Sequence, residues 1–345
     1  MNELFRVAIT GDSFKDGKPV YPSFELKVLS DVEGMEVVPL EENLPVLASH
    51  QVDGIHGVIV LSTRVQSESL ENSDDLLVLS RFGVGYDSVD VAACTESDVV
   101  LCITVGAVDR SVAEATVGWM LSLSHHMRTK DRLVREGRWH DRNGFMGTEL
   151  RGRTLGVIGL GGIGGHLVKL LEGFGMDRPV AFDPYVDAQS ASELGVEKVE
   201  LDELLRISDF VSVHCPLNTE TENLISTNEL SLMKPTAYLI NTARGGIINE
   251  DALFEVLTEQ KIAGAALDCF VGEPITEAHR FGELDNVLLA PHSIAWTEEL
   301  FHDIGLMACH SIIDLAHGRR PDCVVNPEVF DRPSFQEKWK RLRLA

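Results

Sequence analysis

The chain has 345 residues, of which 54 are acidic and 30 are basic, so its formal net charge is −24. A surface this acidic repels the phosphate backbone of nucleic acids and the headgroups of anionic lipids, so we expect neither as a partner. The length exceeds what one hydrophobic core usually organises, which predicts two domains.

The sequence contains no pattern typical of membrane insertion, secretion or disulfide bonding. No apolar run approaches the ~18 residues that a membrane span needs. The segment MNELFRVAITGD is typical of a strand and not of a signal peptide, so we expect a cytoplasmic protein. None of the six cysteines forms a CxxC pair or has zinc-ligand spacing with histidine, which predicts free thiols and no metal site.

The N-terminal third alternates short apolar runs with polar, helix-compatible stretches. The predicted strands are Val7–Thr10, Val37–Leu40, Gly57–Leu61, Leu76–Ser80 and Val99–Ile103. Strands that alternate with helices predict a parallel sheet flanked by helices.

Two long helices are predicted next to this pattern. Ser111–Met127 is interrupted only by Gly118 and is apolar on most faces, which is typical of a buried helix. A second helix is expected from Thr297 to about His317, where Gly318 would end it. We interpret the two helices as the crossings between the domains and as a hinge.

The alternation resumes between these helices. Its predicted strands are Thr154–Gly159, Pro179–Asp183, Phe210–His214, Ala237–Thr242, Gly264–Asp268 and Val287–Ala290. One α/β domain therefore spans residues 106–296 and is inserted between two pieces, 1–105 and 297–345, of a second α/β domain. The segment from Arg319 to Ala345 is interpreted as a tail that wraps around the second domain.

A glycine-rich turn follows the first strand of the inserted domain. Gly159, Gly161 and Gly164 form a GxGxxG motif with a strand before it and a helix after it. The first glycine permits a tight turn, the second lets the backbone approach a pyrophosphate, and the third lets helix and strand pack closely. The N-terminus of the helix favours negative charge. The pattern predicts a dinucleotide site, and a tight turn without a ligand is the alternative.

Asp183 ends the next strand, 19 residues after Gly164. A carboxylate at this spacing accepts a hydrogen bond from the ribose 2′-hydroxyl and repels a 2′-phosphate. Residues 184–186 contain no arginine, so we expect NAD and not NADP. The position of the motif far along the chain, and the absence of a Tyr-x-x-x-Lys pattern, disfavour L-lactate-type and short-chain dehydrogenases.

Three residues at predicted strand ends have the chemistry that hydride transfer to a 2-oxoacid requires. Arg244 can bind a carboxylate with its planar fork, His292 can donate a proton, and Glu273 can hold the imidazole. A surface turn, a loop and a capped strand end are the alternatives for the three positions. Their shared location on one side of one sheet favours a catalytic role.

Seven segments together resemble the D-isomer-specific 2-hydroxyacid dehydrogenase family along nearly the whole chain. They are RFGVGYDSVD, GRTLGVIGLGGIG, FDPY, SVHCPLNTET, LINTARGGIINEDAL, GAALDCFVGEP and APHSIAWTEE. The glycerate and phosphoglycerate dehydrogenase branches and the C-terminal-binding protein branch are the most similar.

The resemblance implies two Rossmann-like domains, with an NAD-binding domain inserted into a discontinuous, flavodoxin-like substrate domain. It implies catalysis by Arg244, Glu273 and His292, and a carboxylate-binding turn at Val84 and Gly85 that acts with Arg244. It also implies a homodimer joined through the cofactor domains. The implied cofactor contacts are Gly159, Gly161, Gly162, Ile163, Gly164, Asp183, Cys215, Pro216, Thr242, Ala243 and Asp268.

The chain departs from the family's pattern at two places. Many members carry arginine, asparagine or lysine where this chain has Gly162, which removes one side chain near the pyrophosphate. Members that act on 3-phosphoglycerate tend to carry arginine where this chain has Leu61 and Ser62, although Arg64 is nearby. Trp296 is similar to a tryptophan that would cover the substrate's tail, and a core tryptophan is the alternative.

Three functions remain open at this point. The first is an NAD-dependent reductase of a small 2-oxoacid such as hydroxypyruvate or glyoxylate. The second is a 3-phosphoglycerate dehydrogenase, because MGTELRGRTLG resembles that branch. The third is an NAD(H)-sensing binding protein similar to the C-terminal-binding proteins.

Overall fold

The computed structural model describes residues 4–16, 18–21, 25–40 and 42–344, which belong to two compact units. The inserted unit is Asp109–Ala295, and the split unit combines Met1–Val108 with Trp296–Ala345. The inserted unit starts three residues later and ends one residue earlier than the predicted domain at 106–296. The assignment of substrate and cofactor to the two units stays a prediction.

A five-stranded parallel sheet forms the centre of the split unit, in the order β4-β1-β5-β6-β7. In chain order this is 2-1-3-4-5, the flavodoxin-like arrangement, so the predicted fold class is confirmed here. The strands are β1 (Phe5–Ile9), β4 (Met35–Pro39), β5 (Gly57–Val60), β6 (Val78–Arg81) and β7 (Val100–Cys102). The structure adds an antiparallel pair that was not predicted, β2 (Phe14–Lys15) with β3 (Lys18–Pro19).

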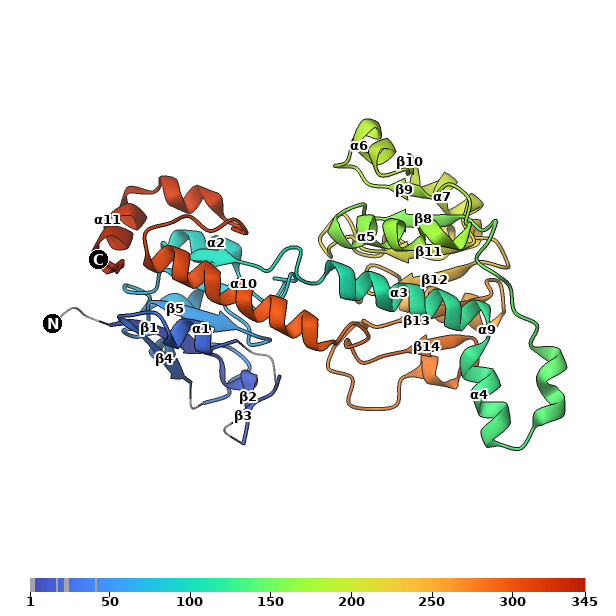
Figure 1. The fold of residues 1–345 in the computed structure, drawn as a ribbon, viewed down its shortest axis with the longest axis horizontal. Helices are drawn as coiled ribbons and strands as arrows, with labels where there is room; N and C mark the ends of the chain where they lie inside the picture. Colours follow the sequence, from blue (N-terminus) through green and yellow to red (C-terminus); the bar gives the residue numbers. More distant parts are fainter. Residues whose placement is uncertain (1–3, 17, 22–24, 41, 345) are drawn as a thin grey trace. The chain divides into compact units, whose positions relative to one another are not determined.

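Helices from both ends of the chain cover this sheet (Figure 1). One face packs against α1 (Lys27–Ser30), α10 (Glu298–Ala316) and α11 (Pro333–Leu342), and the other packs against α2 (Val91–Glu96). The second predicted long helix is confirmed as α10, and Gly318 follows it with a φ of +73°. The sheet of the split unit is therefore buried by a helix that lies about 200 residues later in the sequence.

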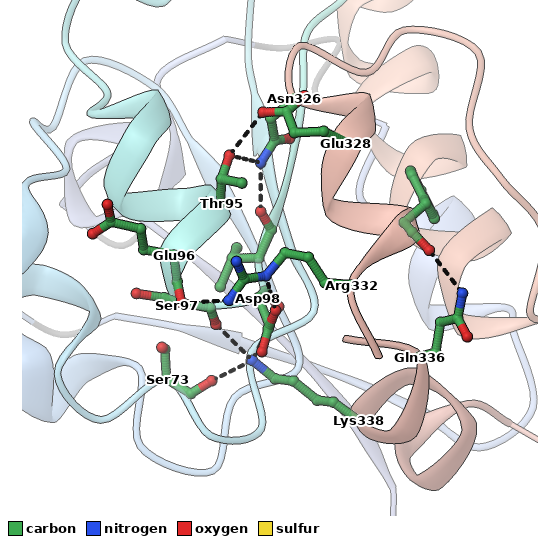
Figure 2. Close-up of polar contacts among 12 residues, drawn as sticks. Ser73, Thr95, Glu96, Ser97, Asp98, Asn326, Glu328, Arg332, Gln336 and Lys338 are labelled. Carbon is green, nitrogen blue, oxygen red and sulfur yellow. Dashed lines mark hydrogen bonds and ion pairs between the residues drawn. The ribbon is translucent and has the colours of Figure 1, made fainter. Parts of the chain in front are cut away.

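Polar side chains of the C-terminal segment bond to the turn after α2 and to the loop before β6 (Figure 2). Arg332 pairs with Asp98 at 2.5 Å, and Lys338 Nζ donates to the carbonyl oxygens of Ser73 at 2.7 Å and Ser97 at 3.2 Å. Burial lowers the pKa of Lys338 to about 8, although the charge of Asp98 opposes this shift. Asn326 donates to the carbonyl oxygen of Val99 at 2.9 Å. The C-terminal segment therefore packs against the N-terminal part of the split unit, and its residues 333–342 form a helix.

The inserted unit has a seven-stranded parallel sheet in the order β10-β9-β8-β11-β12-β13-β14. In chain order this is 3-2-1-4-5-6-7, the Rossmann order with one further strand, so the second half of the predicted fold class is also confirmed. Its strands are β8 (Leu155–Ile158), β9 (Val180–Phe182), β10 (Glu197–Lys198), β11 (Phe210–Val213), β12 (Tyr238–Asn241), β13 (Gly264–Leu267) and β14 (Val287–Leu289).

Two hydrophobic layers cover the faces of this sheet. One layer contains buried side chains of α3 (Asp109–Ser124) and α5 (Gly162–Leu171). The other contains buried side chains of α7 (Leu201–Ile207), α8 (Thr227–Leu232) and α9 (Glu250–Thr258). The strands β8, β11 and β13 are therefore buried on both sides, which explains why their sequences are mostly apolar. A short helix, α6 (Ala188–Glu193), precedes β10.

The prediction of one helix over Ser111–Met127 was wrong at its C-terminal end. The helix α3 stops at Ser124, His126 adopts a left-handed φ of +53°, and α4 (Met127–Arg135) begins directly afterwards. The carbonyl oxygen of Ser124 accepts a hydrogen bond from the N–H of Thr148 at 2.9 Å, so a distant segment caps the helix there.

The interpretation of the long helices as crossings also needs correction. The helix α3 lies wholly within the inserted unit, and α10 lies wholly within the split unit. The chain crosses between the units just before each helix, at Val108–Asp109 and at Ala295–Trp296. Among the helices of the described residues, none is long and apolar enough to span a membrane.

Candidate active site

The predicted cofactor and catalytic residues of the inserted unit follow the carboxyl ends of its parallel strands. The loops after β8 and β11 flank the point where the strand order reverses, because β8 pairs with β9 on one side and β11 on the other. Ligands of open α/β sheets bind at this edge, outside such a switch point. The topology therefore brings together residues from six loops that are far apart in the sequence.

The glycine turn after β8 has no room for side chains at its two ends. Gly159 has a φ of +92°, and a Cβ atom there would lie 2.7 Å from the backbone nitrogen of Cys215. A Cβ at Gly164 would lie 2.5 Å from the carbonyl oxygen of Gly159. A Cβ at Gly161, by contrast, would have nothing within 4 Å. The turn is thus tight against the protein and open at its middle, at the N-terminus of α5, where a pyrophosphate would approach.

Gly162 lies against an acidic residue that the sequence reasoning missed. A Cβ on Gly162 would come within 2.0 Å of Oδ2 of Asp109, the first residue of α3. Burial raises the pKa of Asp109, and the charge of His166 opposes this shift. Many family members carry a side chain at the position of Gly162. In this chain, the carboxylate of Asp109 occupies the space that such a side chain would need. No local pattern could show this, because the two residues are 53 positions apart (162 − 109).

Asp183 follows β9 and accepts hydrogen bonds from three backbone N–H groups. Leu160 donates to Oδ2 at 2.8 Å, and Tyr185 and Val186 donate to Oδ1 at 2.8 and 3.2 Å. The bond from Leu160 ties the acid to the glycine turn. Its carboxylate is thus held beside the glycine turn, at the position where the motif predicts the adenosine ribose of a dinucleotide.

Two buried polar atoms near this edge have no hydrogen-bond partner among the described residues. They are Oγ1 of Thr242, after β12, and Nδ1 of His214, after β11. Burial lowers the pKa of His214 to about 4, so its imidazole is neutral. Its Nε2 lies 2.8 Å from Oγ of Ser212. Unsatisfied buried polar atoms beside an open glycine turn fit a site that is completed by a polar ligand.

The predicted contacts Cys215 and Pro216 extend the same loop. Burial raises the pKa of the Cys215 thiol to about 11, and the charge of Asp183 adds to the shift. The carbonyl oxygen of Pro216 accepts a hydrogen bond from the hydroxyl of Thr221 at 2.6 Å. Cys215 is therefore a neutral thiol next to Gly159 and within electrostatic range of Asp183.

Arg244 is presented by a turn that Asn241 holds together. Asn241 is the last residue of β12 and is only 2% exposed. Its Nδ2 donates to the carbonyl oxygen of Arg244 at 2.8 Å, and its Oδ1 accepts from the N–H of Ala243 at 3.0 Å. The Arg244 Nη1 donates to the carbonyl oxygen of Ala243 at 2.7 Å. Asparagine commonly bonds to its own backbone two residues on, and this was the signal that could have identified Asn241.

Glu273 and His292 form the central pair of the site. Nδ1 of His292 lies 2.7 Å from Oε2 of Glu273, whose Oε1 accepts from the N–H of Phe270 at 2.7 Å. Burial raises the pKa of Glu273, but the two hydrogen bonds and the charges of His292 and Arg244 outweigh burial and hold it below its usual range. The carboxylate is therefore ionised at neutral pH and holds one ring nitrogen of His292, which leaves Nε2 for other partners.

Asp268 fixes the backbone around His292. Its Oδ1 accepts from the N–H groups of Ser293 and Ile294 at 2.8 and 3.1 Å, and its carbonyl oxygen accepts from the N–H of His292 at 2.8 Å. His292 itself has a φ of +51°, a backbone conformation that is uncommon outside glycine. Such conformations cluster at active sites, where the surrounding structure maintains them.

The predicted substrate contacts Val84, Gly85 and Trp296 belong to the split unit. Val84 and Gly85 follow β6 and are half-buried. Trp296 is 52% exposed, so it is not a core residue. It makes edge-on contacts with Tyr21, at a ring distance of 5.3 Å, and with Phe301, at 5.4 Å. Tyr21 and Phe301 thus pack against Trp296, which is the first residue of the second segment of the split unit.

Comparison with known proteins assigns the chain to a family. The sequence model described as "D-isomer specific 2-hydroxyacid dehydrogenase, NAD binding domain" matches residues 117–293. The chain belongs to the D-isomer specific 2-hydroxyacid dehydrogenases. A glyoxylate reductase of this family from Thermococcus litoralis is 35% identical over 285 residues, which are 81% of this chain and 85% of the relative.

Two further relatives extend the comparison. A D-3-phosphoglycerate dehydrogenase from Methanocaldococcus jannaschii is 38% identical over 92% of this chain. The chain spans only 53 to 59% of the length of this and two other D-3-phosphoglycerate dehydrogenases. The crystal structure of D-lactate dehydrogenase from Aquifex aeolicus, complexed with NAD and lactic acid, covers 93% of the chain with a TM-score of 0.81 and 25% identity.

Proposed function

We propose that this chain is an NAD-dependent D-2-hydroxyacid dehydrogenase that reduces a small, unphosphorylated 2-oxoacid such as glyoxylate or hydroxypyruvate. The observation that carries the proposal is the Glu273–His292 pair beside Arg244, at the same sheet edge as the glycine turn. A proton donor, a group that orients it and a carboxylate-binding cation thus flank a dinucleotide site.

The protein's own groups account for the parts of the reaction other than the hydride. Arg244 binds the substrate carboxylate and polarises the C2 carbonyl. His292 delivers a proton to the carbonyl oxygen, while Glu273 holds the ring through Nδ1. NADH, when bound, supplies the hydride to C2. The products are the 2-hydroxyacid and NAD⁺.

The cofactor would be held by the residues at the switch point. The N–H groups of Gly162 and Ile163 would face the pyrophosphate at the N-terminus of α5. Asp183 would accept from the ribose 2′-hydroxyl, which favours NAD over NADP. Thr242 and His214 carry the unsatisfied buried atoms that a polar ligand would satisfy.

The split unit supports an unphosphorylated substrate. Oδ2 of Asp12 accepts hydrogen bonds from the N–H of Ser62 at 2.7 Å, from the Ser62 hydroxyl at 2.6 Å and from the N–H of Thr63 at 3.0 Å. The turn after β5, where the phosphoglycerate enzymes tend to carry arginine, is therefore held by a carboxylate. That negative charge disfavours a phosphate at this position.

The test is NADH oxidation by the purified chain with glyoxylate, hydroxypyruvate, pyruvate, longer and branched 2-oxoacids and 3-phosphohydroxypyruvate. Turnover with one unphosphorylated acid, well above that with the others, supports the proposal. Preference for 3-phosphohydroxypyruvate would instead identify the 3-phosphoglycerate dehydrogenase alternative. Tight NADH binding without turnover of any acid would identify the NAD(H)-sensing alternative.

We also propose a cytoplasmic homodimer that does not bind nucleic acid. Exposed apolar side chains gather on residues 127–149 of the inserted unit, where Val134 is 62% exposed, Trp139 59% and Met146 84%. A second copy that covers them would bury this apolar surface. The free thiols fit a reducing compartment, and the net charge of −24 opposes nucleic acid. Sedimentation equilibrium of the wild type and of Trp139→Glu tests the dimer, which the variant should weaken.

A further inference from the structure

Cys269 lies next to the Glu273–His292 pair, which gives this pair a third side chain that can bind a metal ion. One ligand atom from each of Cys269, Glu273 and His292 lies within 4.8 Å of the other two. Cysteine and histidine spacing predicted no metal site, because Cys269 and Glu273 lie in the loop after β13, whereas His292 follows β14, 19 positions after Glu273 (273 to 292). Only the fold brings them together.

We propose that Cys269, Glu273 and His292 form an inhibitory site for a thiophilic divalent cation, with Zn²⁺ as the best fit. Sulfur, imidazole nitrogen and carboxylate oxygen are the three ligand types that zinc takes in proteins, at about 2.0–2.3 Å. Three protein ligands leave the fourth tetrahedral position open to water. The proposal names a regulation of the proposed dehydrogenase site and therefore rests on the proposed function.

The geometry requires small movements of the ligands. Ligand atoms around a tetrahedral zinc lie roughly 3.2–3.8 Å apart, given the bond lengths above. Nδ1 of His292 and Oε2 of Glu273 are closer than this, at 2.7 Å, because they share a hydrogen bond. If Nδ1 is the imidazole ligand, the cation takes the place of that hydrogen bond. If Nε2 is the ligand, the cation occupies the ring nitrogen that the mechanism needs for proton delivery.

The charges around the site admit a cation but limit its affinity. Glu273 is held in its ionised form, and the carboxyl group of Asp268 is within electrostatic range of both Glu273 and His292. The Arg244 guanidinium is within electrostatic range of Glu273 and opposes the cation. The Cys269 thiol, which donates to the carbonyl oxygen of Ala243 at 3.4 Å, must lose its proton to solvent when it binds the metal.

The site combines a buried ligand with two accessible ones. Cys269 is buried, whereas the side chains of Glu273 and His292 are 31% and 44% exposed. A cation from solvent can therefore bind Glu273 and His292 first and then the buried sulfur of Cys269. Proton release makes binding stronger as the pH rises, because both the thiol and the imidazole must be deprotonated.

The experiment compares the chelator-treated wild type with Cys269→Ala and, as a second variant, the bulkier Cys269→Val. The matched control is Cys323→Ala, which removes a half-buried thiol of the split unit. NADH oxidation is measured against zinc concentration, each protein relative to its own metal-free rate. Cobalt(II) is added separately, and the thiolate-to-cobalt charge-transfer band in the near ultraviolet is recorded.

We expect micromolar zinc to inhibit the wild type and Cys323→Ala, with recovery on adding a chelator. Both Cys269 variants should lose the cobalt band and need about tenfold more zinc or higher, since even supporting residues of metal sites change affinity 10- to 100-fold. Equal zinc sensitivity in all proteins, or a wild type without the cobalt band, would overturn the proposal. A cobalt band that depends on Cys269, in a protein that reduces no 2-oxoacid, would uphold the metal site and contradict the proposed function instead.

Discussion

Replacing Asn241 with alanine removes two hydrogen bonds from the turn that presents Arg244. The side chain is 2% exposed and bonds to the carbonyl oxygen of Arg244 at 2.8 Å and to the N–H of Ala243 at 3.0 Å. The change leaves two backbone groups without a partner, and each such buried group costs about 1–3 kcal/mol. Because water can reach part of this half-buried turn, we expect a total loss of about 2–4 kcal/mol in the free energy of unfolding.

The same change should reduce catalysis, because Arg244 would lose its fixed position. A misplacement of about 1 Å at a reacting group can cost on the order of 100-fold, so we expect kcat/KM to fall roughly 10- to 100-fold. Urea unfolding and steady-state kinetics with the best 2-oxoacid measure the two effects on the same protein. The loss should fall mainly on the affinity for the substrate carboxylate if Arg244 binds it as proposed.

Asn249→Ala provides a matched control for this prediction. Asn249 also bonds to its own backbone, since its Oδ1 accepts from the N–H of Ala252 at 2.9 Å at the start of α9. Its replacement should cost about 1 kcal/mol of stability, as for other helix caps, without changing kcat/KM. If Asn241→Ala is destabilised but keeps kcat/KM within about twofold of the wild type, the side chain does not position Arg244 and the reasoning is refuted.

Three further changes test other parts of the structure. His292→Gln should depress kcat far more than NAD affinity, because it removes the proton donor and leaves the proposed dinucleotide contacts; near-wild-type turnover would exclude His292 from the mechanism. Asp183→Ala should weaken NAD binding and relax discrimination against NADP, as measured by fluorescence titration with both cofactors, and a wild type that already prefers NADP would contradict this role. Folding lowers the pKa of Lys338 from 10.5 to about 8. Between pH 8 and 10.5 the unfolded chain therefore binds more protons at this lysine than the folded chain does. This difference makes the folded protein more stable as the pH rises from 8 towards 10.5. Urea titrations at both ends of that range should therefore show a rise in the wild type that is smaller in Lys338→Met, and identical pH dependence in the two proteins would show that the pKa of Lys338 is not lowered.

The sequence predicted the two sheets well, because strands buried on both faces are continuous apolar runs. It missed β10, a two-residue edge strand of Glu197 and Lys198, because a polar pair has no such signal. The first long helix was predicted to continue past Ser124, because His125 and His126 are compatible with a helix. At the observed end, the N–H of Thr148 bonds to the carbonyl oxygen of Ser124, and this partner is too distant in the sequence to be recognised locally.

The candidate site was predictable in part. Glycine spacing, Asp183 and the strand-end positions of Arg244, Glu273 and His292 follow from patterns within single loops. The structure brings Glu273 and His292 into contact, while their catalytic roles remain predictions. The carboxylate of Asp109 at Gly162 results from packing between distant segments, and the approach of His292 to Cys269 and Glu273 joins two loops, so no single-loop pattern reveals either.

The division of the split unit between the two ends of the chain sets an order for its folding during synthesis. The helix α10 begins 190 residues after the first part of the unit ends at Val108 (298 − 108). At about 5–20 residues per second, its β-strands leave the ribosome roughly 10–40 s before the helix that covers them. The inserted unit is continuous and can complete its sheet in that interval. The nascent N-terminal sheet, by contrast, exposes an apolar face throughout, which makes this segment the expected client of chaperones.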